Sequence, residues 1–157
     1  MLQVMQSIYK KPVFFKWGLS WWAPYLGTGI SIREIAPDFS SLTVQMKMRW
    51  YNRNAFGTHF GGSLYAMVDP YYCLLLVALL GKDYYVWDKA ANIEFIKPGT
   101  GTVKAVFDWS PEQVAVIKAQ AENGEKMFPE RTLDITNEAG EVVARVHKTL
   151  YVRKKKA

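Results

Sequence analysis

One stretch of the chain, residues 54–69, combines the residue types and the spacing that chemistry on a carbonyl group requires. It begins at Asn54, contains the glycine pair Gly61 and Gly62, and ends at the carboxylate of Asp69. A glycine pair at a helix start lets another group approach the first-turn N–H groups, which have no partner within the helix and lie at its positive dipole end. We therefore expect these N–H groups to bind a carbonyl oxygen or an anion.

Asp69 follows this glycine pair by about two helical turns. We expect it to be the residue that does chemistry, as a general base or a nucleophile. The next residue is Pro70, so Asp69 also fits the N-cap of a second helical segment after a kink. Both interpretations stay open at the level of sequence, because a carboxylate can cap one segment and still face a cleft.

Other polar residues of this stretch have structural as well as functional interpretations. Asn54 either orients the attacking water or holds its loop through side-chain hydrogen bonds to the backbone. Gly61 and Gly62 either supply the carbonyl-binding N–H groups or allow a strand to pack closely on the helix. We interpret His59 as a polar surface residue, and Ser63 as a capping or cleft hydroxyl with no base to activate it.

Alternating apolar and polar residues predict the strands that must position this stretch. The clearest alternation lies in residues 42–50, which predicts a strand with one buried and one wet face. The predicted strands cover residues 30–35, 42–50, 90–96, 102–109, 128–136 and 142–152. Turn residues follow the third and the fifth of these strands, and predict two hairpins, 90–96 with 102–109 and 128–136 with 142–152.

Two helices are predicted between these strands. The longer one begins at the glycine pair and ends at Gly81, a residue type that commonly terminates helices. Its segment 70–80 is apolar on every side, so it must be surrounded by protein. The shorter helix begins with a capping box at Ser110 and Gln113 and ends near Glu122.

These elements predict one α+β domain over residues 1–157, in which a curved antiparallel sheet wraps around a long central helix. The length of 157 residues and the hydrophobic content of 50% exclude disorder and suffice for a core. Residues 1–26 are interpreted as an aromatic-rich helical extension that lies over the edge of this core. Residues 153–157 form a basic tail.

Charge and composition restrict the partners. The net charge is +6, but four of these charges lie in residues 153–156, so the rest of the chain carries only +2. We interpret this tail as solvated and expect no nucleic-acid partner. Residues 61–80 are long enough to span a bilayer, yet Asp69 and Pro70 lie at their centre, so we expect no stable membrane insertion.

Cysteine and histidine contents exclude two further kinds of site. Cys73 is the single cysteine, which allows no intrachain disulfide, and its apolar neighbours predict a buried thiol rather than a nucleophile. The two histidines, His59 and His147, lack ligand spacing for zinc, so we expect no metal. The N-terminal residues lack the pattern of a secretory signal, and we expect a cytoplasmic protein.

The same stretch resembles the hotdog-fold thioesterases. In the phenylacetyl-CoA-type branch of this superfamily an Asn is followed by Gly-Thr-x-His-Gly-Gly, and an Asp comes nine residues after the His. The residues here in that register are Asn54, Gly57, Thr58, Gly61, Gly62 and Asp69. Phe60 occupies the His position, and His59 stands one residue earlier, where a shift of the loop would let it recover part of that role. Segments 22–30 and 52–58 resemble a branch called tetrameric acyl-CoA thioesterases or domains of unknown function.

This resemblance implies hydrolysis of an acyl thioester across a dimer interface. It implies that the helix-start N–H groups, above all that of Gly62, bind the carbonyl, that Asp69 attacks or activates water, and that Asn54 assists. Substrate contacts are expected from Gly61, Thr58, His59, Phe60 and Ser63. The resemblance further implies a homodimer or homotetramer and no cofactor, with coenzyme A present only as part of the substrate.

Two alternatives remain open at this stage. The first is a non-catalytic hotdog protein that binds an acyl group or acyl-CoA, motivated by Phe60 at the His position and by the high aromatic content. The second is a protein associated with nucleic acid or a membrane surface, which rests only on the basic residues 153–156.

Overall fold

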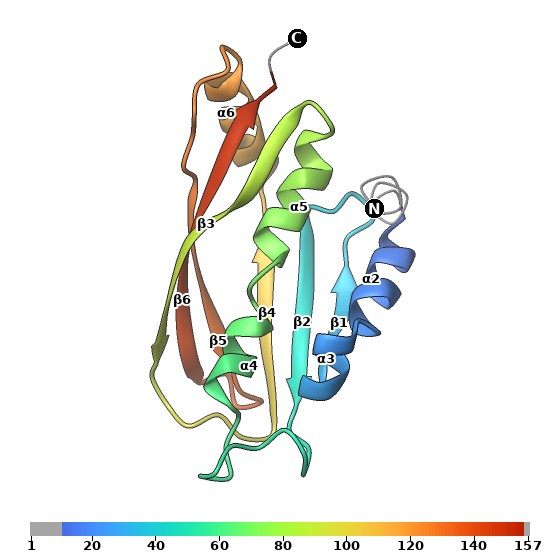
Figure 1. The fold of residues 1–157 in the computed structure, drawn as a ribbon, viewed down its shortest axis with the longest axis vertical. Coiled ribbons are helices and arrows are strands. Elements are labelled where there is room, and N and C mark those ends of the chain that lie inside the picture. The colour runs from blue at the N-terminus through green and yellow to red at the C-terminus, as the bar shows by residue number, and fades with distance from the viewer. Residues whose placement is uncertain (1–10, 156–157) are drawn as a thin grey trace.

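The computed structural model describes residues 11–155. The first ten residues of the expected helical extension and the last two of the basic tail lie outside the described residues. A single six-stranded antiparallel sheet, in the order β1-β2-β4-β5-β6-β3, curves around the central helical segment (Figure 1). The strands are β1 (Ile30–Ile35), β2 (Ser41–Lys47), β3 (Tyr84–Phe95), β4 (Thr102–Asp108), β5 (Glu130–Thr136) and β6 (Val142–Lys154).

The period-two patterns form the strands whose inner side chains make the core. In β2, Val44 and Met46 are fully buried, while the alternate residues are partly exposed. In β4, Val103 and Phe107 are buried in the same way, as the alternation predicts. The predicted strand at 42–50 is too long, because β2 ends at Lys47 and the chain then turns away from the sheet.

The central helical segment consists of two helices, α4 (Gly61–Ala66) and α5 (Tyr71–Leu80), separated by a turn at residues 67–70. The break falls at Asp69-Pro70, where the sequence predicts a kink, because proline cannot donate the N–H that would continue the helix. Among the described residues, Gly61–Leu80 is the one helical stretch with the length and hydropathy of a membrane span. Of its most apolar window, 56% is buried inside the protein.

The predicted hairpin of 90–96 with 102–109 is wrong. The third strand begins at Tyr84 and pairs with β6 along its length, whereas β4 lies between β2 and β5. The two strands thus lie at an edge and in the middle of the sheet, and residues 96–101 cross between these places (Figure 1). Alternation of apolar and polar residues predicts that a segment is a strand, but long-range contacts determine which strand it pairs with. The predicted pairing of 128–136 with 142–152 is confirmed, as β5 with β6.

Within residues 11–155, three further helices lie outside the central segment. Helices α2 (Pro12–Ser20) and α3 (Ala23–Thr28) pack against β1 at one edge of the sheet, and β3 forms the opposite edge (Figure 1). Helix α6 (Pro111–Ala121) begins with the predicted capping box: Gln113 N–H donates to Ser110 Oγ at 3.2 Å, and Ser110 N–H donates to Gln113 Oε1 at 2.9 Å. These two bonds satisfy N–H groups that a helix start leaves unpaired.

Candidate active site

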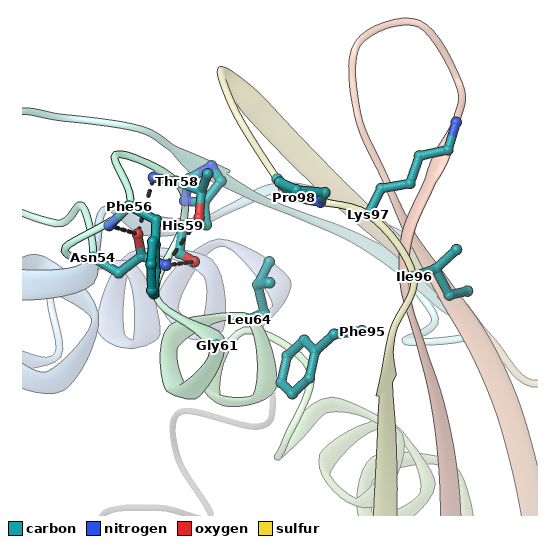
Figure 2. A pocket seen from close by; sticks show the side chains of 11 residues that line it. Asn54, Phe56, Thr58, His59, Gly61, Leu64, Phe95, Ile96, Lys97 and Pro98 are labelled. Atoms are coloured by element: carbon teal, nitrogen blue, oxygen red, sulfur yellow. Dashed lines mark hydrogen bonds between the residues drawn. The ribbon is translucent and has the colours of Figure 1, made fainter.

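A groove of about 590 Å³ lies between the loop that precedes α4 and the segment that follows β3 (Figure 2). Side chains of Phe56, Leu64 and Phe95 make its walls largely apolar, and Phe95 projects from β3 toward α4. Its lining residues are Asn54, Phe56, Thr58, His59, Gly61, Leu64, Phe95, Ile96, Lys97, Pro98 and Gly99. The sequence points to the loop side of this groove, but the opposite wall comes from the end of β3 and the residues after it, whose position in the sheet the sequence did not predict.

Asn54 closes the loop on which it lies. Its Oδ1 accepts hydrogen bonds from the N–H groups of Phe56 at 3.0 Å and Thr58 at 3.1 Å. Its Nδ2 donates to Thr58 Oγ1 at 2.9 Å and to the His59 carbonyl at 3.2 Å (Figure 2). Because both polar atoms are engaged by the loop, the geometry favours the loop-holding interpretation of Asn54 over the orientation of water.

His59 is buried, so its interpretation as a surface residue is wrong. Its residue exposure is 3%, and its Nε2 lies 3.0 Å from the Gly101 carbonyl oxygen. The His59 N–H also donates to the Gly99 carbonyl, at 2.9 Å. The turn that precedes β4 therefore covers the imidazole, a long-range contact that the sequence around His59 does not reveal.

Burial determines the charge of this imidazole. Desolvation lowers the pKa of His59 below its usual value, and the hydrogen bond with the Gly101 carbonyl opposes this only partly. The neutral ring then donates from Nε2, which leaves Nδ1 as an acceptor. Nδ1 is buried and has no hydrogen-bond partner among the described residues.

The two glycines at the start of α4 are both crowded. A Cβ on Gly61 would lie 3.0 Å from the Phe95 ring, and a Cβ on Gly62 would lie 2.5 Å from the Phe60 ring. Their N–H groups belong to the first helical turn, which has no intrahelical acceptors. The Phe95 ring of β3 fits the close helix–strand packing predicted for Gly61, whereas the ring beside Gly62 belongs to Phe60 of the preceding loop.

The remaining predicted contacts differ in exposure. Phe60 is 58% exposed and covers Gly62, so an apolar ring stands where the resemblance expects an imidazole. Ser63 is buried, at 6% exposure. Thr58 lines the groove and binds Asn54.

Asp69 lies at the break between α4 and α5 with 48% of its side chain exposed. The capping interpretation is wrong, because Pro70 is the N-cap residue of α5 and the helix start has no side-chain hydrogen bond. Instead, Asp69 faces Lys148 of β6, whose Nζ donates to the Asp69 carbonyl at 2.6 Å and lies 3.4 Å from its Oδ1. Its carboxylate is therefore held by a cation and remains accessible.

Lys148 is the centre of a charged cluster. Its side chain is fully buried, and Nζ makes an ion pair of 2.8 Å with Asp88 Oδ1 of β3 in addition to its contact with Asp69. Burial raises the pKa of Asp88, an effect that Lys148 opposes and Asp69 reinforces. A buried ammonium requires such partners, because an unpaired charge is very costly to remove from water.

Two groups beside this cluster are poor nucleophiles. Burial and the Asp88 carboxylate raise the pKa of Cys73 to about 12, so its thiol is protonated at neutral pH. Burial and a hydrogen bond with Asp69 raise the pKa of Tyr65 to about 12. Of the two carboxylates that contact Lys148, Asp69 is the more exposed, with 48% of its side chain accessible against 30% for Asp88.

Sequence reasoning missed Lys148 and Asp88. A signal was present, since Lys148 stands between Val146 and Leu150 in the inward register of β6. A lysine in an apolar register predicts a buried partner, but nothing local identifies that partner. Four of the predicted residues line the groove, namely Asn54, Thr58, His59 and Gly61, whereas Phe60, Gly62, Ser63 and Asp69 are not among its lining residues.

The sheet order and the enclosed α4–α5 segment define a hotdog fold of the kind found in thioesterases. PA5026 of Pseudomonas aeruginosa, described as a protein of unknown function and probable thioesterase, is similar over 98% of this chain and 96% of its own, with a TM-score of 0.75 and 18% identity. Thioesterase HI1161 of Haemophilus influenzae is similar over 87% of each chain, with a TM-score of 0.63 and 18% identity. A protein of unknown function from Chlorobaculum tepidum, OLEI01261, gives a TM-score of 0.74 and 19% identity over 94% of this chain and 99% of its own.

Within this class, the chain belongs to the DUF4442 family, a domain of unknown function, whose model matches residues 12–152. No curated protein matches its sequence. The expected hotdog fold is confirmed, and the matched family agrees with the domain-of-unknown-function branch that the sequence resembles. At these identities the solved structures support the fold, and the roles of individual residues depend on the site itself.

Proposed function

We propose that this protein is a thioesterase that hydrolyses an acyl thioester, with acyl-CoA as the substrate. The observation that carries the proposal is Asp69: a half-exposed carboxylate at the helix break, held by the buried ammonium of Lys148. A carboxylate in this position can bind and deprotonate a water molecule. The similarity to proteins described as thioesterases supports the same reaction class.

The glycine pair and Asp69 have different roles in the proposed reaction. In the proposed reaction, the N–H groups of Gly61 and Gly62 donate to the thioester oxygen, where negative charge develops as water adds. Asp69 accepts one proton from the attacking water. The tetrahedral intermediate then breaks its C–S bond, and the proton passes from Asp69 to the leaving sulfur. The products are a carboxylic acid and the free thiol of coenzyme A.

We further propose that two copies of the chain complete the site. Within one chain, Asp69 does not line the groove formed by the glycine loop, so the carboxylate of one copy would serve the groove of another. The unpaired outer edge of β3 supports such an assembly, because β3 is a twelve-residue strand at the end of the sheet and exposed edges favour pairing. Apolar residues exposed beside the groove, Phe60, Phe95 and Ile96, add to the surface that pairing would cover.

The test compares two carboxylates that contact the same lysine. Purified protein is assayed for thiol release from short-, medium- and long-chain and aromatic acyl-CoAs, as wild type, Asp69→Asn and Asp88→Asn. We expect Asp69→Asn to lower turnover by at least about a hundredfold, the contribution of a positioned general base, with its melting temperature maintained. We expect Asp88→Asn to retain most of the turnover.

No thiol release from any substrate by the wild type would overturn the proposal. Equal losses in the two variants would instead assign both carboxylates to the support of Lys148 and remove Asp69 from the chemistry. A second candidate function is favoured by Phe60, which places an apolar ring where an imidazole is expected and suits the binding of an acyl chain. Saturable acyl-CoA binding without hydrolysis, unaffected by Asp69→Asn, would support this non-catalytic alternative.

A further inference from the structure

Helices α2 and α3 and the residues between them expose large apolar side chains, which together we call the N-terminal aromatic face. Its members are 49–66% exposed: Val13, Phe14, Trp17, Trp21, Trp22 and Leu26. Phe14, Trp17 and Trp21 are spaced by three and four residues and so share one side of the helix. A soluble surface rarely leaves this many large apolar side chains together without a partner.

The face is exposed because the opposite side of the same helices is anchored. Phe15 and Tyr25 are buried in the core, at 1% and 2% exposure, and the Tyr25 hydroxyl donates to the Ala66 carbonyl at 3.2 Å. Each helix therefore already packs through one side against the sheet. The exposed aromatic residues are a second apolar side, which the core does not use.

Charge identifies the partner that suits this face. The first acidic residue of the chain is Glu34, whereas residues 1–33 contain Lys10, Lys11, Lys16 and Arg33. Within the described part, the Lys11 ammonium lies 5.9 Å from the centre of the Phe14 ring, and Lys16 Nζ donates to the Arg33 carbonyl. Tryptophan and phenylalanine beside basic residues, with no acidic residue among them, match the boundary between headgroups and acyl chains of an anionic lipid surface.

The N-terminal aromatic face lies away from the sheet edge at which two copies of the chain are proposed to join. It adjoins β1 at one edge of the sheet, and β3 forms the opposite edge (Figure 1). An assembly through β3 would therefore leave the face uncovered on each copy.

We propose that the N-terminal aromatic face binds an anionic lipid surface, with its tryptophan rings inserted at the level of the headgroups and its lysines against the phosphates. The protein then lies on the membrane and does not span it. This inference is independent of the proposed thioesterase activity, since it requires neither Asp69 nor the groove. It extends the sequence expectation of no stable membrane insertion to a defined mode of surface attachment.

Sedimentation with vesicles tests the proposal. The full chain is mixed with vesicles of phosphatidylcholine alone or of phosphatidylcholine with phosphatidylglycerol, at low and at high salt. We expect binding to the mixed vesicles that weakens with salt, and quenching of tryptophan fluorescence by lipids brominated in the upper acyl chain. The triple variant Phe14→Ser, Trp17→Ser, Trp21→Ser should bind at least about tenfold more weakly, because it removes the apolar area.

A matched variant controls for the loss of exposed aromatic residues in general. Trp50→Ser, Tyr51→Ser, Phe128→Ser removes rings of 44–84% exposure from the segment after β2 and the segment before β5, and should bind within about twofold of the wild type. A tail variant, Lys154→Glu with Lys155→Glu, separates the contribution of the basic tail. Circular dichroism checks the fold of each variant, and light scattering measures its molar mass.

Three outcomes would overturn the proposal. The first is no binding of the wild type to the mixed vesicles. The second is undiminished binding of the Phe14, Trp17 and Trp21 variant, with or without loss in the tail variant, which would assign lipid binding elsewhere. The third is a lower molar mass of the same triple variant in solution, which would show that the face joins copies of this chain.

Discussion

At the scale of single residues, two buried polar side chains, Lys148 and His59, determine the charges around the candidate site. The fold places the side chain of Lys148 between two carboxylates, whereas burial lowers the pKa of His59 and so favours its neutral form. The Lys148 ammonium contacts Asp69 from within the protein, and 48% of the Asp69 side chain stays exposed. The roles of these residues in catalysis stay predictions until turnover is measured.

The neutral state of His59 predicts a stability that falls in acid. Above the ordinary histidine value of 6.5 the imidazole is neutral in both states and has no effect on the free energy of unfolding. Below that value the unfolded chain takes up the proton first, because burial lowers the pKa of the folded state. Stability is therefore lost as pH falls from about 6.5 toward the lower folded-state pKa.

Urea unfolding at about pH 7.5 and about pH 5 measures this loss. We expect the wild type to lose more stability between the two pH values than His59→Gln, which keeps an N–H donor for the Gly101 carbonyl but does not titrate. Equal losses in the two proteins would mean that His59 is not held neutral.

Element boundaries depend on a few backbone positions, and the junction of α3 with β1 is one. Gly29 ends α3 at a φ of 74°, and a Cβ there would lie 2.8 Å from the Lys47 carbonyl oxygen and 2.9 Å from Asn52 Nδ2. Asn52 donates to the carbonyls of Thr28 and Lys47, at 2.8 and 2.9 Å. It thereby ties the helix end to the end of β2 and requires glycine beside it.

Substitution of Gly29 should therefore lower the free energy of unfolding by more than the left-handed backbone conformation alone would explain. The backbone conformation should lower the free energy of unfolding of Gly29→Ala by about 1–2 kcal/mol. The overpacked contact should lower it by about 1–3 kcal/mol more. Gly140→Ala is the matched control, because Gly140 has a φ of 79° and nothing within 4 Å of its Cβ position. Denaturant unfolding measures both variants, and equal costs would contradict the role assigned to the Asn52 contact.

At the scale of the whole molecule, the sheet has two edges with different surroundings. Helices α2 and α3 pack against β1, while β3 presents its outer edge and the apolar residues beside the groove. We expect the β3 edge to join copies of the chain and the N-terminal aromatic face to contact lipid. The two surfaces lie at opposite edges, so one copy can use both at once.

Light scattering after size exclusion tests the first surface. The molar mass of the wild type should be at least twice the 18.0 kDa of one chain. Phe95→Glu, at a position 59% exposed at the end of β3, should shift the protein toward that single-chain mass. Val106→Glu on the outer face of β4, at 55% exposure, should leave the mass unchanged. A monomeric wild type would exclude a site completed by two copies.

Features that depend on near neighbours were predictable from the sequence. The alternation of β2 and β4, the capping box of α6 and the helix break at Asp69-Pro70 follow from side-chain periodicity, N-terminal hydrogen bonds and the missing N–H of proline. The resemblance of the Asn54–Asp69 stretch to the hotdog thioesterases likewise required only residues in a fixed register. Sequence alone thus determined the fold class and drew attention to Asp69.

Tertiary structure alone decided which distant groups meet. It placed β3 beside β6, buried His59 under the turn at Gly99–Gly101, and brought Lys148 to Asp69, 79 residues earlier in the chain. Local propensity contains no information on such pairs, because their free energy comes from burying apolar surface and pairing charges that only the folded chain brings together. The same physics separated Asp69 from the groove within one chain, and so made a second copy part of the proposed site.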